Sequence, residues 1–264
     1  MHLSEANQGA VGIKNIIVNS DVPVPVAPTM DKKLHIEFIG DSITCAYGVE
    51  GKDQYEGFKT STENFMRSYA YLTAEKLDAD CSAVSYSGFG IISGYSSNGT
   101  KQSNKLVPDN YENVGIGNYK KPWDFKTFRN DVVVINLGTN DDTYVSKDFD
   151  TRSAEFTKGY TEFLEKVHEL NPDAYIICTL GTMGCTELYP CIEQAAEEFK
   201  KSTETEKNKR CAPLKKDEYD KLEQYKSELK ESASFDILNI ICDEKNSNSF
   251  ILLSLFIYFF ILLI

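Results

Sequence analysis

The sequence predicts a three-layer α/β/α domain in which helices cover both faces of a parallel β-sheet. Short apolar segments that read as buried strands alternate along the chain with longer amphipathic segments that read as helices. One of the strands, Asp131 to Leu137 (DVVVINL), carries a continuous apolar run, which is typical of the centre of a parallel sheet. Glycine-containing turns follow three of the predicted strands, where α/β proteins place their ligands.

The first half of this domain begins with a strand over Leu34 to Ile39. A helix is expected over Glu63 to Leu77, because apolar residues recur there at helical intervals and Thr60 and Glu63 have the spacing of a capping box. A second short strand follows at Cys81 to Tyr86. Residues 87–121 are rich in Gly, Ser, Asn and Tyr, which predicts a long functional loop.

The second half follows the Asp131–Leu137 strand with a helix at Arg152 to Leu170, which Asn171-Pro172 should end. Ala174 to Leu180 is the next predicted strand, again buried. The remaining elements are expected in this order: a helix at 192–201, a charged and loose stretch at 200–216, a solvated helix at 217–232 and a last strand at 235–241.

The regions outside the main domain differ from it in composition. We therefore expect three segments: residues 1–31, the main domain at 32–242, and residues 243–264. Val22 to Pro28 (VPVPVAP) reads as a stiff linker, and Gly9 to Val18 before it as a single strand without a partner. These two features predict the remnant of an upstream domain. The first ten residues lack the pattern of a signal peptide, which fits a cytosolic protein or a chain that starts downstream of its true beginning.

The last fifteen residues, Phe250 to Ile264, are apolar except for Ser254. As a helix they would span about 22 Å, less than the roughly 30 Å of a bilayer's hydrocarbon core. Three interpretations follow: an accidental tail, as from a misread exon boundary, a membrane anchor, or a buried segment. Contact with a membrane is expected only if this tail is genuine.

The charge and the cysteines exclude several classes of function. The net charge of −12 argues against a nucleic-acid partner, because phosphate contacts need clustered Lys and Arg. The seven cysteines show no C-x-x-C spacing, so neither a zinc site nor a thioredoxin-type site is expected. We predict buried thiols, with room for one disulfide, and neither a metal nor a cofactor.

Three short motifs end three predicted strands: Gly40-Asp41-Ser42-Ile43-Thr44, Ser87-Gly88-Phe89-Gly90 and Gly138-Thr139-Asn140-Asp141. The first by itself is also compatible with an ordinary strand-to-helix turn. Carboxyl ends of parallel strands share one edge of the sheet, so the three motifs should meet there. A serine hydroxyl with the Gly88 N–H and the Asn140 amide nearby is the donor arrangement that acyl transfer needs.

The motifs resemble blocks I, II and III of the SGNH (GDSL-type) hydrolases. Ile36 to Gly51 and Asp131 to Asp141 are more similar still to carbohydrate esterase family 2, and the resemblance covers about residues 34–195. It implies a flavodoxin-like hydrolase domain behind a jelly-roll domain. It also implies a secreted, extracellular acetyl xylan esterase that takes part in polysaccharide degradation. A departure from the family pattern is Ala46, where glycine is commoner.

The resemblance implies a role for each motif: Ser42 as nucleophile, and the Ser42 N–H, the Gly88 N–H and the Asn140 side chain as oxyanion hole. It also implies a histidine base near the C-terminus, where this sequence has none. The sequence holds only His2, His35 and His168; His35 should lie at the sheet edge opposite Ser42. The base is therefore unknown and the chain is expected to be impaired as written, through a gene-model error or genuine degeneration.

The expected partner is an acetylated plant cell-wall polysaccharide or oligosaccharide. Trp123, Tyr47 and Tyr86 are candidates for stacking on its sugar rings, with ordinary core aromatics as the alternative. Two rival functions stay open. One is a catalytically inactive carbohydrate-binding pseudoenzyme; the other is an SGNH esterase or lipase of different acyl specificity, membrane-anchored through the tail.

Overall fold

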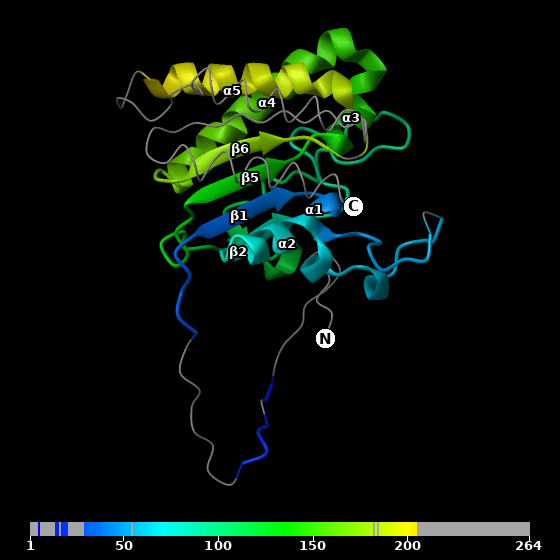
Figure 1. The fold of residues 1–264 in the computed structure, drawn as a ribbon. Coiled ribbons are helices and arrows are strands. Elements are labelled where there is room, and N and C mark those ends of the chain that lie inside the picture. The colour runs from blue at the N-terminus through cyan, green and yellow to red at the C-terminus, as the bar shows by residue number, and fades with distance from the viewer. Residues whose placement is uncertain are drawn as a thin grey trace, which may run out of the picture.

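The computed structural model describes residues 5, 14–15, 17–20, 29–53, 55–181, 183 and 185–204 of the chain (Figure 1). Several predictions lie outside these residues: the linker at 22–28, the helix at 217–232, the strand at 235–241 and the tail at 250–264.

The core of the domain is a sheet of four parallel strands in the order β2-β1-β5-β6 (Figure 1). This order confirms the predicted parallel sheet, and each strand ends within one residue of its predicted bounds. The strands are β1 (His35–Gly40), β2 (Asp80–Ser85), β5 (Val132–Asn136) and β6 (Tyr175–Thr179). After β1 the chain adds β2 on one side of it, and then adds β5 and β6 on the other side. The point where the strand order reverses, the topological switch point, therefore lies between β1 and β5.

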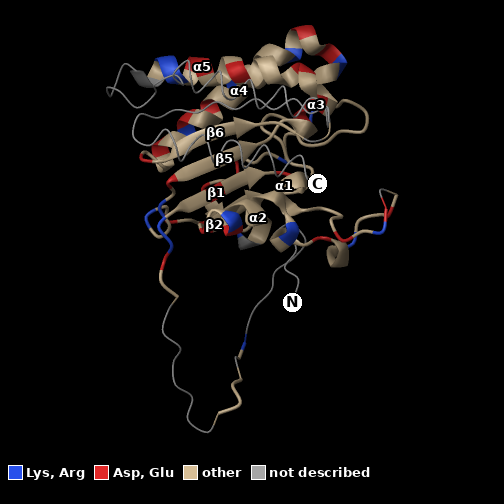
Figure 2. Cartoon of the chain, viewed as in Figure 1, with Lys and Arg blue, Asp and Glu red and all other residues tan. Residues whose placement is uncertain are grey.

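Helices cover both faces of this sheet, which confirms the three layers. On one face, Phe38 of β1 and Val134 of β5 pack with Tyr69 of α2. On the other, Ile135 of β5 packs with Phe156 of α4, and α5 lies alongside α4 (Figure 1). The helices are α1 (Ser42–Cys45), α2 (Tyr69–Lys76), α3 (Thr139–Val145), α4 (Phe149–Leu170) and α5 (Tyr189–Glu204). Acidic and basic side chains are interspersed along α4 and α5 (Figure 2).

The segment between β2 and β5 is largely irregular, as predicted, with one small two-stranded ribbon. Its strands are β3 (Asn113–Val114) and β4 (Lys121–Pro122), which pair antiparallel. Short 3₁₀ turns complete the described elements: η2 (Thr60–Thr62), η3 (Phe65–Arg67), η4 (Gly117–Tyr119), η5 (Ser146–Asp148) and η6 (Thr186–Leu188).

Three local predictions are wrong. The capping box at Thr60 and Glu63 does not form, because that segment is a 3₁₀ turn; α2 begins at Tyr69, where the Ser68 hydroxyl accepts the N–H of Tyr71. Of the loose stretch predicted at 200–216, residues 200–204 instead continue α5, and residues 205–216 lie outside the described residues. The strand predicted at Gly9 to Val18 is absent at its described positions 14, 15, 17 and 18.

The described cysteines are all free thiols: Cys45, Cys81, Cys178, Cys185 and Cys191. Three of them, Cys45, Cys178 and Cys191, are buried, in agreement with the prediction of buried thiols. Within the part of the chain that the structure describes, no helix is both long enough and apolar enough to cross a membrane.

A buried carboxyl lies inside β1. Glu37 is 3 % exposed and accepts a hydrogen bond from the Tyr111 hydroxyl, which in turn accepts one from the Asn171 amide at 2.7 Å. No Lys, Arg or His among the described residues forms an ion pair with Glu37. Burial therefore raises the pKa of Glu37 to about 7, although the Tyr111 hydrogen bond opposes the shift.

We expect this carboxyl to make stability fall as pH rises. The folded state holds the Glu37 proton up to about pH 7, and the unfolded state releases it near pH 4.5, so ionisation costs the fold stability between these values. Glu37→Gln keeps an acceptor for Tyr111 without a charge. At pH 8 it should be more stable than the parent by up to about 3 kcal/mol, measured by urea unfolding.

The same comparison at pH 4 should show little advantage for Glu37→Gln. Glu75→Gln, on the exposed side of α2, controls for the loss of one charge. An advantage of Glu37→Gln that does not change between pH 4 and pH 8 would show that the buried carboxyl does not titrate as argued.

Candidate active site

The three predicted motifs lie at the carboxyl ends of β1, β2 and β5, around the switch point of the sheet. Ser42 begins α1 directly after β1, and Thr139 and Asn140 begin α3 shortly after β5 (Figure 1). Ser87 and Gly88 follow β2. An open α/β sheet forms its ligand crevice at this position, because the loops on either side of the switch point diverge.

The first turn depends on Gly40 and Asp41. A β-carbon on Gly40 would lie 2.0 Å from Thr44 Oγ1, so only glycine allows α1 to fold back this closely onto β1. The fully buried Asp41 caps α1 by accepting the N–H of Ile43 at 3.0 Å. This geometry leaves Ser42 half-buried at the first position of the helix.

Ala46 ends α1 in the left-handed conformation, with φ 62°. Glycine adopts this conformation without strain, whereas an L-residue with a β-carbon loses about 1 kcal/mol or more. The turn therefore shows why glycine is commoner at this position, and that alanine is accommodated there.

Asn140 connects the three turns. Its side-chain amide donates to the carbonyl oxygen of Phe89 at 2.8 Å and to Asp41 Oδ2 at 3.2 Å, and the residue is 6 % exposed. Phe89 follows Gly88 and Asp41 precedes Ser42 in the chain. The structure therefore brings the three predicted residues, Ser42, Gly88 and Asn140, to one place.

Asp141 holds the second turn, which follows β2 and contains Ser87 to Gly90. The sequence analysis missed this role of Asp141. Its carboxylate accepts the backbone N–H groups of Ile91, Ile92 and Ser93 at 2.8–3.0 Å, and it is fully buried. Burial raises the pKa of Asp141 to about 6 and that of Asp41 to about 7; in Asp41 the nearby Asp141 charge adds to the effect of burial. A buried carboxyl thus serves as the acceptor for three consecutive N–H groups that have no backbone acceptor among the described residues.

Gly88 has the conformation that the second motif requires. Its φ of +80° lies in the left-handed region, and its carbonyl oxygen accepts the N–H of Tyr95 at 2.8 Å. No described residue accepts a hydrogen bond from the Gly88 N–H itself. This amide is therefore available to a ligand.

A cluster of three other ionisable residues lies beside the second turn. The ligand atoms of Glu5, Cys45 and Glu63 are all within 4.8 Å of one another, and the Glu5 carboxylate accepts the N–H of Ser87. Burial raises the pKa of Glu5 to about 7 and also raises that of the Cys45 thiol. Both shifts favour the protonated forms of these groups at neutral pH, and a metal ion bound here would have to displace their protons.

The described histidines lie away from Ser42. His35 is at the amino end of β1, as expected, where its ring stacks on Phe128 at 4.8 Å and Nδ1 bonds with the carbonyl of Arg129. His168 is in the last turn of α4, edge-on to Phe199. His2 lies outside the described residues. The structure thus places neither described histidine where it could take a proton from Ser42.

The three aromatic candidates are not brought together. Tyr47 is 45 % exposed, stacks on Phe58 at 4.8 Å and donates its N–H to the carbonyl of Ser42, so it lies beside Ser42. Tyr86 is buried against Phe89 in the core beneath the second turn. Trp123 follows β4, with its backbone N–H bonded to the carbonyl of Glu112, and no described backbone hydrogen bond joins it to the three turns.

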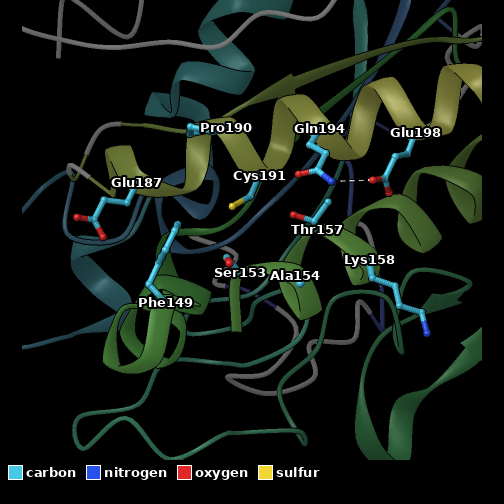
Figure 3. A pocket seen from close by; sticks show the side chains of 10 residues that line it. All are labelled: Phe149, Ser153, Ala154, Thr157, Lys158, Glu187, Pro190, Cys191, Gln194 and Glu198. Carbon is cyan, nitrogen blue, oxygen red and sulfur yellow. Dashed lines mark hydrogen bonds between the residues drawn. The ribbon is translucent and has the colours of Figure 1, made fainter. Parts of the chain in front are cut away.

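A separate groove of about 870 Å³ runs between α4 and α5 (Figure 3). Side chains such as Phe149, Ser153 and Cys191 line it, and the Gln194 amide donates to Glu198 at 2.8 Å along one side. None of the three motifs contributes a residue to it. The groove is a gap between two packed helices and not part of the candidate active site.

Comparison with known proteins supports the same interpretation. Residues 38–234 match the GDSL-like Lipase/Acylhydrolase family. The chain is 36 % identical over 188 residues to the cellulase/esterase CelE of Acetivibrio thermocellus, covering 68 % of this chain and 21 % of that protein. It is 30 % identical to an acetylxylan esterase / glucomannan deacetylase of Cellvibrio japonicus, covering 69 % of this chain and 49 % of that protein. The chain thus spans half or less of these relatives.

Solved structures give the same result for the fold. A family two carbohydrate esterase from Clostridium thermocellum, in complex with cellohexaose, is 33 % identical with a TM-score of 0.56, covering 69 % of this chain and 54 % of that one. The acetyl xylan esterase Est2A from Butyrivibrio proteoclasticus is 26 % identical with a TM-score of 0.60, covering 70 % and 55 %. These likenesses confirm the resemblance that the three motifs indicated.

Proposed function

Because this chain belongs to the GDSL-like Lipase/Acylhydrolase family, we propose that it is an ester hydrolase that removes O-acetyl groups from a plant polysaccharide through an acyl-Ser42 intermediate. The observation that carries the proposal is the pair of hydrogen bonds from Asn140 to Phe89 and Asp41. These bonds join the turns that carry Ser42, Gly88 and Asn140, which supports a site built from a serine hydroxyl, a glycine N–H and a side-chain amide.

In the proposed reaction the Ser42 hydroxyl attacks the acetyl carbonyl carbon, and the carbonyl oxygen takes up the negative charge. The N–H groups of Ser42 and Gly88 then stabilise this oxyanion, and the Asn140 amide joins them by giving up its longer hydrogen bond, at 3.2 Å, to Asp41. A single such donor is worth about 3 kcal/mol of barrier. The intermediate expels the sugar hydroxyl and leaves acetyl-Ser42, which water hydrolyses to acetate and free Ser42.

The proton of Ser42 needs an acceptor, and no described histidine can provide one. A serine hydroxyl without a base is a weak nucleophile. We therefore propose that the 264 residues by themselves hydrolyse esters slowly, and that the base belongs to the histidine block that the family resemblance implies.

The names of the relatives and the aromatic side chains beside Ser42 support a substrate class. Those relatives are named as acetylxylan esterases and glucomannan deacetylases, and one solved structure holds cellohexaose. The stacked Tyr47–Phe58 pair beside Ser42 offers an aromatic face to a sugar ring. We accordingly propose an acetylated xylan or glucomannan as substrate, and an extracellular site of action.

A second candidate function is carbohydrate binding without hydrolysis. It is favoured by the distance of His35 and His168 from Ser42. A solved structure with a TM-score of 0.57 and 27 % identity carries a description of divergent catalytic and non-catalytic binding functions in the active site of a carbohydrate esterase. In this case the three turns would form a binding pocket only.

Acetate release from acetylated xylan and titration with cellohexaose separate these possibilities. We expect saturable binding of the oligosaccharide, with the same Kd in Ser42→Ala as in the parent chain. We also expect slow acetate release from the parent chain, at a rate that Ser42→Ala does not exceed. Binding with no acetate release above the buffer rate would support carbohydrate binding as the only function. Hydrolysis of long-chain acyl esters in preference to acetylated xylan would contradict both and favour a lipase-like specificity.

A further inference from the structure

The side chains of Tyr95 and Lys105 lie next to Gly88, and the proposed reaction does not use them. A β-carbon placed on Gly88 would lie 4.0 Å from Lys105 Nζ and 4.0 Å from Tyr95 Cβ. We infer that Tyr95 and Lys105 form a subsite that binds a carboxylate-bearing sugar next to the ester, which makes the preferred substrate an acidic polysaccharide. This inference rests on the proposed function, which it narrows.

The backbones of both residues are tied to the second turn. Tyr95 donates its N–H to the Gly88 carbonyl at 2.8 Å, and the Lys105 carbonyl accepts the N–H of Gly90 at 3.1 Å. Leu106, the next residue, forms an isolated bridge with Gly90. The backbone positions from which the two side chains extend are therefore fixed relative to Gly88, the proposed oxyanion donor.

The Lys105 ammonium has no protein partner to neutralise it. No described carboxylate lies within salt-bridge distance of it, and the residue is exposed. Lys101, nearby in sequence, differs in this respect because it pairs with Glu155. Among the acids of the site, Glu5 and Asp41 have pKa values raised to about 7, so they carry only part of their charge near neutral pH, and Asp141 already accepts three backbone N–H groups.

A free ammonium beside an ester-binding site selects for a negative group on the substrate. The acetyl group itself is neutral, so the carboxylate must belong to the sugar chain. Tyr95 provides the second contact: it is 55 % exposed, and a phenol ring can stack on a sugar while its hydroxyl stays in water. Uronic acids are sugars with this combination of a ring face and a carboxylate.

Binding measurements on the full chain test the subsite without requiring catalysis. Three ligands of matched length are titrated by calorimetry: a xylo-oligosaccharide with one glucuronic acid branch, the unbranched xylo-oligosaccharide, and an oligogalacturonate. The first two distinguish acidic from neutral chains. The third distinguishes a carboxylate on a branch from one on the main chain.

We expect at least one acidic ligand to bind more tightly than the neutral one, and Lys105→Met to weaken that ligand about fivefold in Kd while leaving the neutral ligand unchanged. The difference should shrink at high salt. Tyr95→Ala should weaken acidic and neutral ligands alike. Lys105→Arg should keep the preference, and Lys158→Met on α4 makes the same charge change without effect.

Equal losses for acidic and neutral ligands in Lys105→Met, or no loss for either, would overturn the subsite. The proposed function fails separately. If acetate release from acetylated xylan is observed but Lys105→Met does not weaken the acidic ligand selectively, the subsite alone is rejected.

Discussion

A chimera in which a histidine-bearing C-terminal block of a family member replaces the segment after residue 204 is expected to hydrolyse an aryl acetate at least about 10³-fold faster than the 264-residue chain. In the proposed mechanism the three turns position Ser42 with its oxyanion donors, and the block adds the proton acceptor. An imidazole within reach of Ser42 converts the hydroxyl to an effective nucleophile. Steady-state release of the aryl alcohol measures the difference.

Ser42→Ala is expected to have effects of very different size on the rates of these two proteins. In the chimera it should lower kcat by up to about 10⁶-fold, because serine and base act as one unit. In the 264-residue chain it should change the slow rate by less than about tenfold, since the base is already lacking.

Ser153→Ala provides the matched control, because Ser153 lies in the groove between α4 and α5 and not among the three turns. It should leave both proteins unchanged. A chimera that hydrolyses the ester equally well with alanine at position 42 would show that Ser42 is not the nucleophile, whatever the family kinship.

Asp141→Ala is expected to destabilise the fold by about 3 kcal/mol or more. The change removes the acceptor of three buried N–H groups, those of Ile91, Ile92 and Ser93, and unsatisfied buried donors cost about 1–3 kcal/mol each. Urea unfolding at pH 8, where the carboxyl is ionised, measures the loss. Hydrogen exchange of the same three amides should accelerate before the rest of the protein unfolds.

Asp141→Asn should be milder, because Oδ1 by itself is within bonding distance of all three N–H groups. Asp142→Ala supplies the control for the loss of a neighbouring acid, since Asp142 is only half-buried. Equal losses of stability in Asp141→Ala and Asp142→Ala would show that the backbone contacts do not hold the second turn.

The sequence by itself determined the four strands and the meeting of three motifs at one edge. Buried parallel strands need continuous apolar runs, and this signal is local, so Asp131 to Leu137 identified β5 to within one residue. Parallel strands also place their carboxyl ends together whatever surrounds them. For this reason Ser42, Gly88 and Asn140 could be assigned to one site without coordinates.

Only the tertiary structure decided how these parts are held. Thr60 and Ser68 are both residues that cap helices. The helix α2 begins at Tyr69, after the Ser68 cap, where Tyr69 can pack on Phe38 and bond with Thr44. The partners of Asp141 lie about 50 residues away in sequence, and no local pattern names them. Burial of a side chain depends on contacts between distant segments, whereas the strand signals depend only on neighbours along the chain.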